Sequence, residues 1–362
     1  MPSHAPPEDA GGKRRPPGMT DVARAAGVSQ KTVSRVINNE RYVSADVRER
    51  VLTAAAELGY RPNTAARALI TGRSQRIGVV SLGTALYGPA SLLVALERAT
   101  RAAGFSFMIA NTVEDQPDSL QQAIDWLLDQ GVDGIVIAEP IADGPALRLD
   151  TDTPIVSIGQ ASGIPEAVPG TRTVADSREA TEHLLDLGHE RVWHIGGPSR
   201  WWEARDRLKG WRQAHTDRGI IAPPPFEGDW TPASGYQAGL ELSRDPEVTA
   251  VFCANDDMAI GLIGALAESG RRIPESISIV GFDDIPAAAF LTPPLTTIPQ
   301  DFEADATRGL DLLLRHLPGA ATAEPGTADR TAEPAPGRRL VVRGSTAPPP
   351  FRRNEVPQRK EQ

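Results

Sequence analysis

The sequence predicts a small all-α head with a helix-turn-helix, followed by an α/β core of two lobes, each with a parallel sheet. Three observations support this architecture. Residues 20–39 read as two short helices around a glycine. From residue 76 onward, short apolar runs alternate with helical stretches. Residues 1–75 hold 12 Lys and Arg against 7 Asp and Glu, whereas residues 76–362 hold 26 against 40. A basic head on an acidic body is typical of a chain in which one small module contacts phosphates.

In the head, the first helix is expected to begin at Thr20, a good N-cap residue, and to bury one side through Val22 and Ala26. Gly27 can take the left-handed conformation that ends this helix and turns the chain. Ser29 then caps a second helix, whose buried stripe consists of Val33, Val36 and Ile37.

The outward face of the second helix carries side chains suited to DNA: Gln30, Lys31, Ser34, Arg35 and Asn38. In the major groove, Arg and Lys pair with guanine, and Gln and Asn pair with adenine. The first turn of such a helix approaches the base edges most closely, which favours Gln30, Lys31 and Arg35 as base readers. An ordinary helical hairpin with a solvated polar face fits the same pattern, so this face alone does not establish DNA binding.

A third helix is expected from Ser44 to about Leu58, ended by Gly59, and a segment of small residues follows at 61–70. With these elements the chain resembles the LacI family of bacterial transcription regulators. The resemblance is carried by Asp21-Val22-Ala23, Ala26-Gly27-Val28-Ser29, Thr32-Val33-Ser34-Arg35-Val36, Gly59-Tyr60, Pro62-Asn63 and Ala68-Leu69. It continues through most of the chain to residues 341–346.

The resemblance implies a DNA-binding role for particular residues of the head. It assigns base reading to Gln30, Lys31 and Arg35. Ser29, Thr32, Ser34 and Asn38 are expected to contact phosphates or to position the helix, and Thr20 is also expected to contact DNA. Residues 65–69 match the family's hinge helix, and Asn63, Ala66 and Leu69 are expected to contact DNA there. Leu69 would wedge into a minor-groove step and kink the duplex. The hinge helix is too short to be stable without DNA and a partner copy.

In the core, continuous apolar runs indicate strands covered on both faces, as in a parallel sheet between helices. The expected strands are 77–82, 105–110, 134–138 and 154–158, and then 191–195, 250–253 and 276–280. The expected helices are about 90–103, 117–130, 177–187, 203–217, 234–243 and 257–269. The resemblance implies a periplasmic-binding-protein-like core with three crossovers, which we place near 189, 298 and 337.

The resulting domain prediction has six parts. They are a disordered tail (1–18), the DNA-binding head (19–60), a hinge and linker (61–75), the two-lobe core (76–347), a flexible insertion (319–337) and a flexible tail (348–362). Within the core, lobe 1 takes about 76–189 and 298–318, and lobe 2 takes about 190–297 and 338–347. The tail lacks the leucine heptads with which some family members form tetramers. A homodimer on a palindromic operator is therefore expected.

The family resemblance also places an effector pocket between the lobes. The matching positions are Tyr87, Pro89, Asp176, Trp201, Arg205, Trp230, Asn255, Asp283, Gln300 and Phe302. Arg and Asp can bracket sugar hydroxyls with charge-assisted hydrogen bonds, and Trp offers a flat face to a pyranose ring. These positions are most similar to the lac-repressor branch of the family. That branch has small polar residues where this chain has Trp201-Trp202, which favours a longer glycoside such as a β-linked disaccharide.

The predicted function is a repressor of carbohydrate-utilisation genes that a sugar releases from its operator. A regulator of the same family that uses a corepressor, or an activator, is the alternative. Two other classes are less favoured. A secreted sugar-binding protein would have no DNA-binding head. A glycosidase would need paired carboxylates, for which Asp256-Asp257 and Asp283-Asp284 are the candidates.

Composition agrees with a cytoplasmic regulator that needs no cofactor and no metal. The one cysteine, Cys253, excludes an intrachain disulfide and is expected to be buried in a strand. No apolar stretch approaches the roughly 18 residues of a membrane helix, and no phosphate-binding lysine loop or zinc spacing is present.

Overall fold

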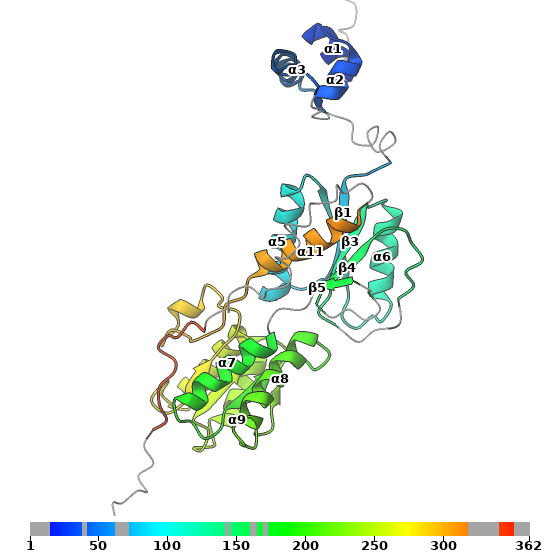
Figure 1. The fold of residues 1–362 in the computed structure, drawn as a ribbon. Helices are drawn as coiled ribbons and strands as arrows, with labels where there is room; N and C mark the ends of the chain where they lie inside the picture. Colours follow the sequence, from blue (N-terminus) through cyan, green and yellow to red (C-terminus); the bar gives the residue numbers. More distant parts are fainter. Residues whose placement is uncertain are drawn as a thin grey trace, which may run out of the picture. The chain divides into compact units, whose positions relative to one another are not determined.

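A computed structural model describes residues 15–37, 42–61, 72–141, 145, 147–159, 164, 166–168, 173–317 and 340–350. The chain forms two compact units, residues 1–74 and residues 75–362 (Figure 1). The predicted DNA contacts Asn38, Asn63, Ala66 and Leu69 lie outside the described residues, as do the predicted insertion 319–337 and most of both tails.

The described residues of the first unit form three helices: α1 (Met19–Ala26), α2 (Gln30–Ile37) and α3 (Ala45–Leu58). Their buried faces meet in one small core, to which the helices contribute Val22, Ala23, Ala26, Val33, Val36, Val51, Ala54 and Ala55. Gly27 and Gly59 have φ values of 65° and 64° and end α1 and α3, as predicted. The predicted helix-turn-helix is therefore confirmed.

The caps of these helices differ in part from the prediction. Helix α1 begins at Met19, and the N–H of Gly18 donates to Asp21 Oδ2 at 2.9 Å, so Thr20 lies inside the helix and is not its N-cap. Ser29 does cap α2, since its Oγ accepts the Thr32 N–H at 3.1 Å. Ser44 stands at the N-cap of α3 without a side-chain capping bond.

The first lobe of the second unit is built on a five-stranded parallel sheet of order β2-β1-β3-β4-β5. Its strands are β1 (Arg76–Leu82), β2 (Ser106–Thr112), β3 (Gly134–Ala138), β4 (Ile155–Ile158) and β5 (Glu166–Val168). Helices α5 (Tyr87–Ala102) and α11 (Phe302–His316) pack together over one face, whose core includes Ile77, Leu96, Val136 and Leu313. Helix α6 (Ser119–Asp129) covers the other face through Ile124 and Leu127.

The second lobe has a four-stranded parallel sheet of order β7-β6-β8-β9. Its strands are β6 (Trp193–Gly196), β7 (Phe226–Glu227), β8 (Ala250–Cys253) and β9 (Ser278–Val280). Helices α7 (Thr173–Asp186) and α8 (Trp202–Thr216) cover one face, and α9 (Pro232–Leu242) and α10 (Asp256–Glu268) cover the other. A 3-10 turn spans Ala288–Phe290. Cys253 is fully buried in β8, as predicted.

One predicted crossing between the lobes is corrected. Helix α7 packs on α8 in the second lobe (Figure 1), so the chain first crosses between residues 168 and 173 and not near 189. The return to the first lobe agrees with the prediction, since α11 begins at Phe302 and packs beside α5. The second crossing thus falls at 299–301, close to the predicted position. The third lies outside the described residues.

Among the described residues, no helix combines the length and the apolar character that crossing a membrane requires.

One arginine ties together the loops at the bottom of the second lobe. Arg271 follows α10, and its guanidinium donates to four backbone carbonyls: Leu242 at 3.3 Å, Asp245 at 2.9 Å, Val248 at 2.5 Å and Ser276 at 3.1 Å. These carbonyls belong to the α9–β8 connection and to the turn before β9. Arg271 thus satisfies acceptors that strands and helices leave open.

We expect Arg271→Ala to lower the free energy of unfolding by about 2–4 kcal/mol, because several part-buried carbonyls lose their donor at once. Arg272→Ala is the matched control, since the neighbouring side chain is exposed; its loss should stay below about 0.5 kcal/mol. Urea unfolding followed by circular dichroism measures both. Equal losses in the two variants would contradict the assigned role.

Candidate functional site

A cavity that is partly open to solvent lies where the carboxyl ends of the two sheets face each other. The carboxyl ends of parallel strands are the usual place of small-molecule sites in such folds. The start of α5, the start of α8 and the start of α11 complete the wall. Eight of the ten predicted effector residues line it: Tyr87, Pro89, Trp201, Trp230, Asn255, Asp283, Gln300 and Phe302.

Two predicted residues do not line the cavity. Arg205 is exposed and lines a groove on the outer side of α8, whereas Arg207 faces the cavity. Positions two apart on a helix point roughly 200° apart, so Arg205 and Arg207 cannot share a face. The arginine of the cavity wall is therefore Arg207, and the prediction of Arg205 is wrong. Asp176 is fully buried in the first turn of α7 and is not part of the cavity wall.

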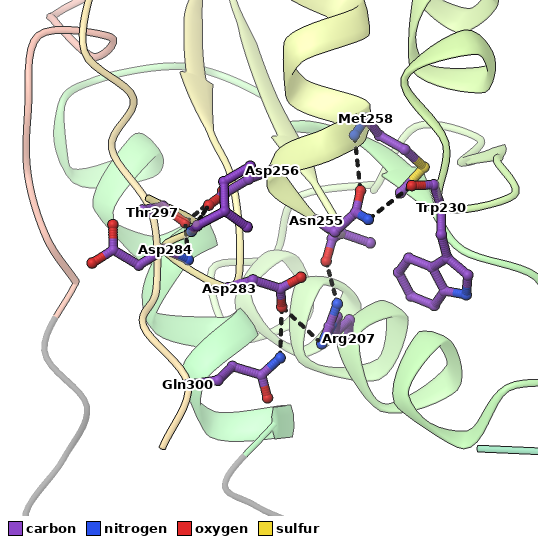
Figure 2. Close-up of polar contacts among 11 residues, drawn as sticks. Arg207, Trp230, Asn255, Asp256, Met258, Asp283, Asp284, Thr297 and Gln300 are labelled. Atoms are coloured by element: carbon purple, nitrogen blue, oxygen red, sulfur yellow. Dashed lines mark hydrogen bonds and ion pairs between the residues drawn. The ribbon is translucent and has the colours of Figure 1, made fainter. Parts of the chain in front are cut away.

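A buried ion pair forms the polar centre of the cavity (Figure 2). Arg207 Nη2 lies 3.4 Å from Asp283 Oδ1, and the two side chains are 5% and 6% exposed. Arg207 Nη1 donates to the carbonyl of Ala254 at 2.5 Å, and Gln300 Nε2 donates to Asp283 Oδ1 at 2.6 Å. Burial raises the pKa of Asp283 to about 6, although Arg207 and Gln300 oppose the shift.

The backbone around this centre is strained. Trp230 and Asp283 have φ values of 70° and 110°, in the region that non-glycine residues rarely adopt. Asn255 supports Trp230, since its Nδ2 donates to the Trp230 carbonyl at 3.0 Å. The Asn255 Oδ1 in turn caps α10 by accepting the Met258 N–H at 2.9 Å (Figure 2). The capping bond therefore holds Asn255 in place for its bond to Trp230.

Aromatic rings provide flat walls. Trp201 and Trp230 have centroids 5.5 Å apart, and Tyr87 meets Phe302 edge-on at 6.0 Å. Trp202 packs against Gly159, where a Cβ atom would come within 2.5 Å of the indole, and Trp230 packs against Gly197 at 2.2 Å by the same measure. Among the described residues, the buried Nε1 atoms of Trp202 and Trp230 have no hydrogen-bond partner. The indoles thus leave two donors for a ligand.

Acidic residues of the cavity were missing from the sequence prediction. Glu139, Glu203 and Asp305 all line it. Glu139 directly follows β3, where a side chain at the carboxyl end of a strand could have been suspected. It accepts the Thr112 hydroxyl at 2.5 Å and the Ile141 N–H at 3.4 Å, and burial raises its pKa. Glu203 lies one helical turn before Arg207, which is the spacing that could have revealed it.

The carboxylate pairs considered for glycoside hydrolysis do not meet in the cavity. Asp256 is buried behind it and accepts the Thr297 hydroxyl at 2.6 Å and the Ile285 N–H at 2.9 Å (Figure 2). Asp284 pairs with Arg343 at 2.7 Å. Neither carboxylate of the Asp256-Asp257 pair lines the cavity, and of the Asp283-Asp284 pair only Asp283 does.

The two lobes also contact each other directly beside the cavity, through a segment that we call the latch, residues 200–202. Trp201 bridges to Ile141, and the Trp202 N–H donates to the Pro140 carbonyl at 3.1 Å. Arg200 Nη1 donates to Asp115 Oδ1 at 3.1 Å, and Trp201 Nε1 donates to Glu114 at 3.4 Å. Since Trp201 and Trp202 also line the cavity, the latch joins the ligand space to the contact between lobes.

The head presents a second candidate surface. The exposed side chains of α2 include Gln30, Lys31 and Arg35. Thr20 in the first turn of α1 and Ser29 just before α2 are exposed as well. Thr32 and Ser34 are partly buried, and the Thr32 and Ser29 hydroxyls lie 2.9 Å apart. The structure thus gathers the predicted base-reading side chains on one helix, with the apolar residues of α2 turned inward.

Comparison with known proteins matches both parts of the chain. A family model described as bacterial regulatory proteins, lacI family, matches residues 18–63, and one described as a periplasmic binding protein-like domain matches residues 181–346. The chain is 35% identical to the lactose operon repressor of Escherichia coli (strain K12) over 311 residues, which are 85% of this chain and 86% of that protein.

Solved structures agree. A lac repressor dimer bound to operator and the anti-inducer ONPF superposes with a TM-score of 0.74 and 32% identity, covering 92% of this chain and 100% of that one. A complex of the transcriptional regulator CelR with cellobiose gives a TM-score of 0.64 and 31% identity, covering 91% of this chain and 99% of that one.

The contact between Gly159 and Trp202 can be tested by Gly159→Ala. The added methyl would overlap the indole, so we expect Trp202 to shift and the free energy of unfolding to fall by about 2–4 kcal/mol. Gly104→Ala is the control: Gly104 has a similar φ of 83°, against 90° for Gly159, but open space around its Cβ position. Its cost is that of backbone strain alone, about 1–2 kcal/mol. Chemical unfolding and tryptophan fluorescence distinguish the two, and an unchanged spectrum in Gly159→Ala would refute the contact.

Proposed function

The chain belongs to the LacI family of bacterial regulatory proteins, and from this membership we propose that it represses transcription until a saccharide fills the cavity. The observation that carries the proposal is the joint presence of a helix-turn-helix head and a cavity with a buried Arg207–Asp283 pair beside Trp230. Head and cavity correspond to the two activities of a ligand-controlled DNA-binding protein.

The cavity supports a saccharide as the ligand. Asp283 and the guanidinium of Arg207 can bracket neighbouring hydroxyls, and Asn255 offers both donor and acceptor chemistry. Trp201, Trp202 and Trp230 supply apolar surfaces for the C–H faces of sugar rings. Three indoles in one cavity favour a ligand with more than one ring. The cellobiose complex among the similar structures points to the same class, a disaccharide or glycoside.

The head supports operator binding. Gln30 and Lys31 open α2 and would reach base edges, while Ser29 and Thr32 would fix the helix on phosphates. We propose a homodimer on a palindromic operator, as in the dimer–operator complex among the similar structures. We place this activity in the cytoplasm, where operator DNA lies, and assign it to genes for carbohydrate utilisation.

The mechanism follows from linkage. A saccharide that binds one lobe arrangement better must shift the protein towards it, and operator affinity changes by the same coupling free energy. We propose that the preferred arrangement disfavours the paired hinge around Leu69, so that the ligand releases the operator. The alternative is a corepressor or an activator. In that case the ligand tightens operator binding or does not release it.

The test uses an operator fragment selected in vitro from randomised DNA, with fluorescence anisotropy against a panel of mono- and disaccharides. We expect a disaccharide to release the fragment. A panel member that tightens binding would favour the corepressor reading, and a panel without any effect would overturn the proposed saccharide effector.

Arg207→Lys and Arg205→Lys form a matched pair on α8. We expect Arg207→Lys to require at least about tenfold more saccharide for release, because lysine cannot bond Ala254 and Asp283 with one planar fork. Arg205→Lys should respond as the wild type, since its side chain is outside the cavity. Both should bind the operator normally without saccharide. Anisotropy titrations compare the two variants with the wild type. An equal shift of the saccharide concentration in both variants would show that Arg207 does not contact the ligand.

Lys31→Ala tests the head. We expect the variant to lose about 1–3 kcal/mol of affinity for the operator and far less for random DNA, because Lys31 is assigned to base edges. Arg50→Ala removes the same charge from the exposed side of α3, where Arg50 pairs with Asp46 at 3.5 Å, and should change operator affinity little. A loss by Lys31→Ala that is equal on operator and random DNA would instead place Lys31 on a phosphate.

A further inference from the structure

The cavity contains more acids than bases. Four carboxyl groups line it, Glu139, Glu203, Asp283 and Asp305, against the single guanidinium of Arg207. Asp283 is paired with Arg207, and Asp305 is paired with Arg308. Within the part of the chain that the structure describes, Glu139 and Glu203 have no ion-pair partner. Each of these two carboxyl groups can therefore contact the ligand or be neutralised by binding a proton.

Glu203 differs from Glu139 in its hydrogen bonding. Glu139 accepts from Thr112 and from Ile141. The Oε2 of Glu203 is shielded from solvent and has no hydrogen-bond partner among the described residues. A buried polar atom without a partner is costly, and in a ligand cavity it is commonly completed by the ligand. The unused oxygen therefore identifies Glu203 as a ligand-contacting residue.

The surroundings of Glu203 determine its protonation. The pKa of Glu203 is raised to about 8, mainly by burial; Glu139 of the first lobe and Asp206 of α8 contribute to the rise, while Arg207 opposes it. The carboxyl is therefore mostly neutral at pH 7. A neutral carboxyl carries one O–H donor in addition to its acceptor oxygens.

We propose that Glu203 determines specificity for the effector, and that its O–H donates a hydrogen bond to an oxygen of an uncharged, unphosphorylated saccharide. The inference rests on the proposed saccharide effector, and it restricts that effector to saccharides without a charged group.

Unpartnered atoms elsewhere in the cavity agree with an uncharged ligand. Arg207 Nε and the Nε1 atoms of Trp202 and Trp230 are buried donors without a partner among the described residues. An ammonium group has donors only and cannot satisfy them. A phosphate has acceptors, but the one guanidinium that lines the cavity already bonds Asp283 and Ala254, and a dianion would lie beside the carboxyl groups of Asp283 and Asp305. Neutral hydroxyl groups satisfy donors and acceptors alike.

Glu203→Gln and Glu203→Ala test the proposal in the full-length protein by calorimetry. The probes are cellobiose, lactose, maltose and gentiobiose, each beside its 6-phosphate. We expect the disaccharide that releases the operator to bind Glu203→Gln within about threefold of the wild type, because an amide also donates, and to bind Glu203→Ala at least about tenfold more weakly. Its 6-phosphate should bind at least about tenfold more weakly than the parent.

The pH dependence separates a donor from a merely structural residue. Because the protonated carboxyl of Glu203 binds, and because Asp283 with a pKa of about 6 is already ionised in this range, wild-type affinity should fall roughly 20-fold between pH 7.5 and 9.5. Glu203→Gln should remove this fall, whereas Asp206→Asn, outside the cavity wall, should keep it.

The outcomes also separate this inference from the proposed function. A 6-phosphate or an amino disaccharide that binds more tightly than its neutral parent overturns the inference, as does a Glu203→Gln variant that retains the fall with pH. In both cases release of the operator by a saccharide still stands. If no disaccharide binds, the saccharide effector fails, and the inference fails with it.

Discussion

The buried pair of Arg207 and Asp283 is the interaction on which the cavity depends. Arg207 comes from α8, Asp283 follows β9, and Gln300 reaches them from the crossing segment. The guanidinium also lies 4.1 Å from the Phe282 ring and 5.2 Å from the Trp230 ring. Pairs of this kind add little to stability when compared with apolar residues, but losing one partner leaves a buried charge uncompensated. The pair is therefore better explained by ligand recognition than by folding.

Strain and close packing surround this pair. The positive φ of Trp230 is maintained by the bond from Asn255, and Asp284, with a φ of 52°, is held by Arg343 and by the Thr297 hydroxyl. Such conformations persist only where neighbouring bonds fix them, and they concentrate at functional sites. Gly159 and Gly197 leave room for two indoles that a larger residue would displace. The shape of the cavity thus depends in part on residues outside its wall, such as Gly159, Gly197 and Arg343.

The sequence predicted most of this arrangement, and its failures have physical causes. Continuous apolar runs located seven strands, but β5 and β7 are too short to give such a signal. Helix α7 was assigned to the wrong lobe because periodicity gives the buried face of a helix but not its partner. Arg205 was chosen instead of Arg207 because the two arginines lie only two residues apart in the sequence. Only their positions around the helix axis separate them. Glu139 and Glu203 went unnoticed, since a carboxylate at a strand or helix end is usually solvated.

The latch connects the cavity to the relation between the lobes. Its contacts run from residues 200–202 of the second lobe to Glu114, Asp115 and Pro140 of the first. The ion pairs of Arg200 are exposed and contribute little alone. Trp201 and Trp202, however, are buried and belong to both the latch and the cavity wall. A ligand that moves either indole must also alter contacts between the lobes. Differential contact of this kind is what a ligand needs in order to shift a conformational equilibrium, because equal affinity for both arrangements would shift nothing.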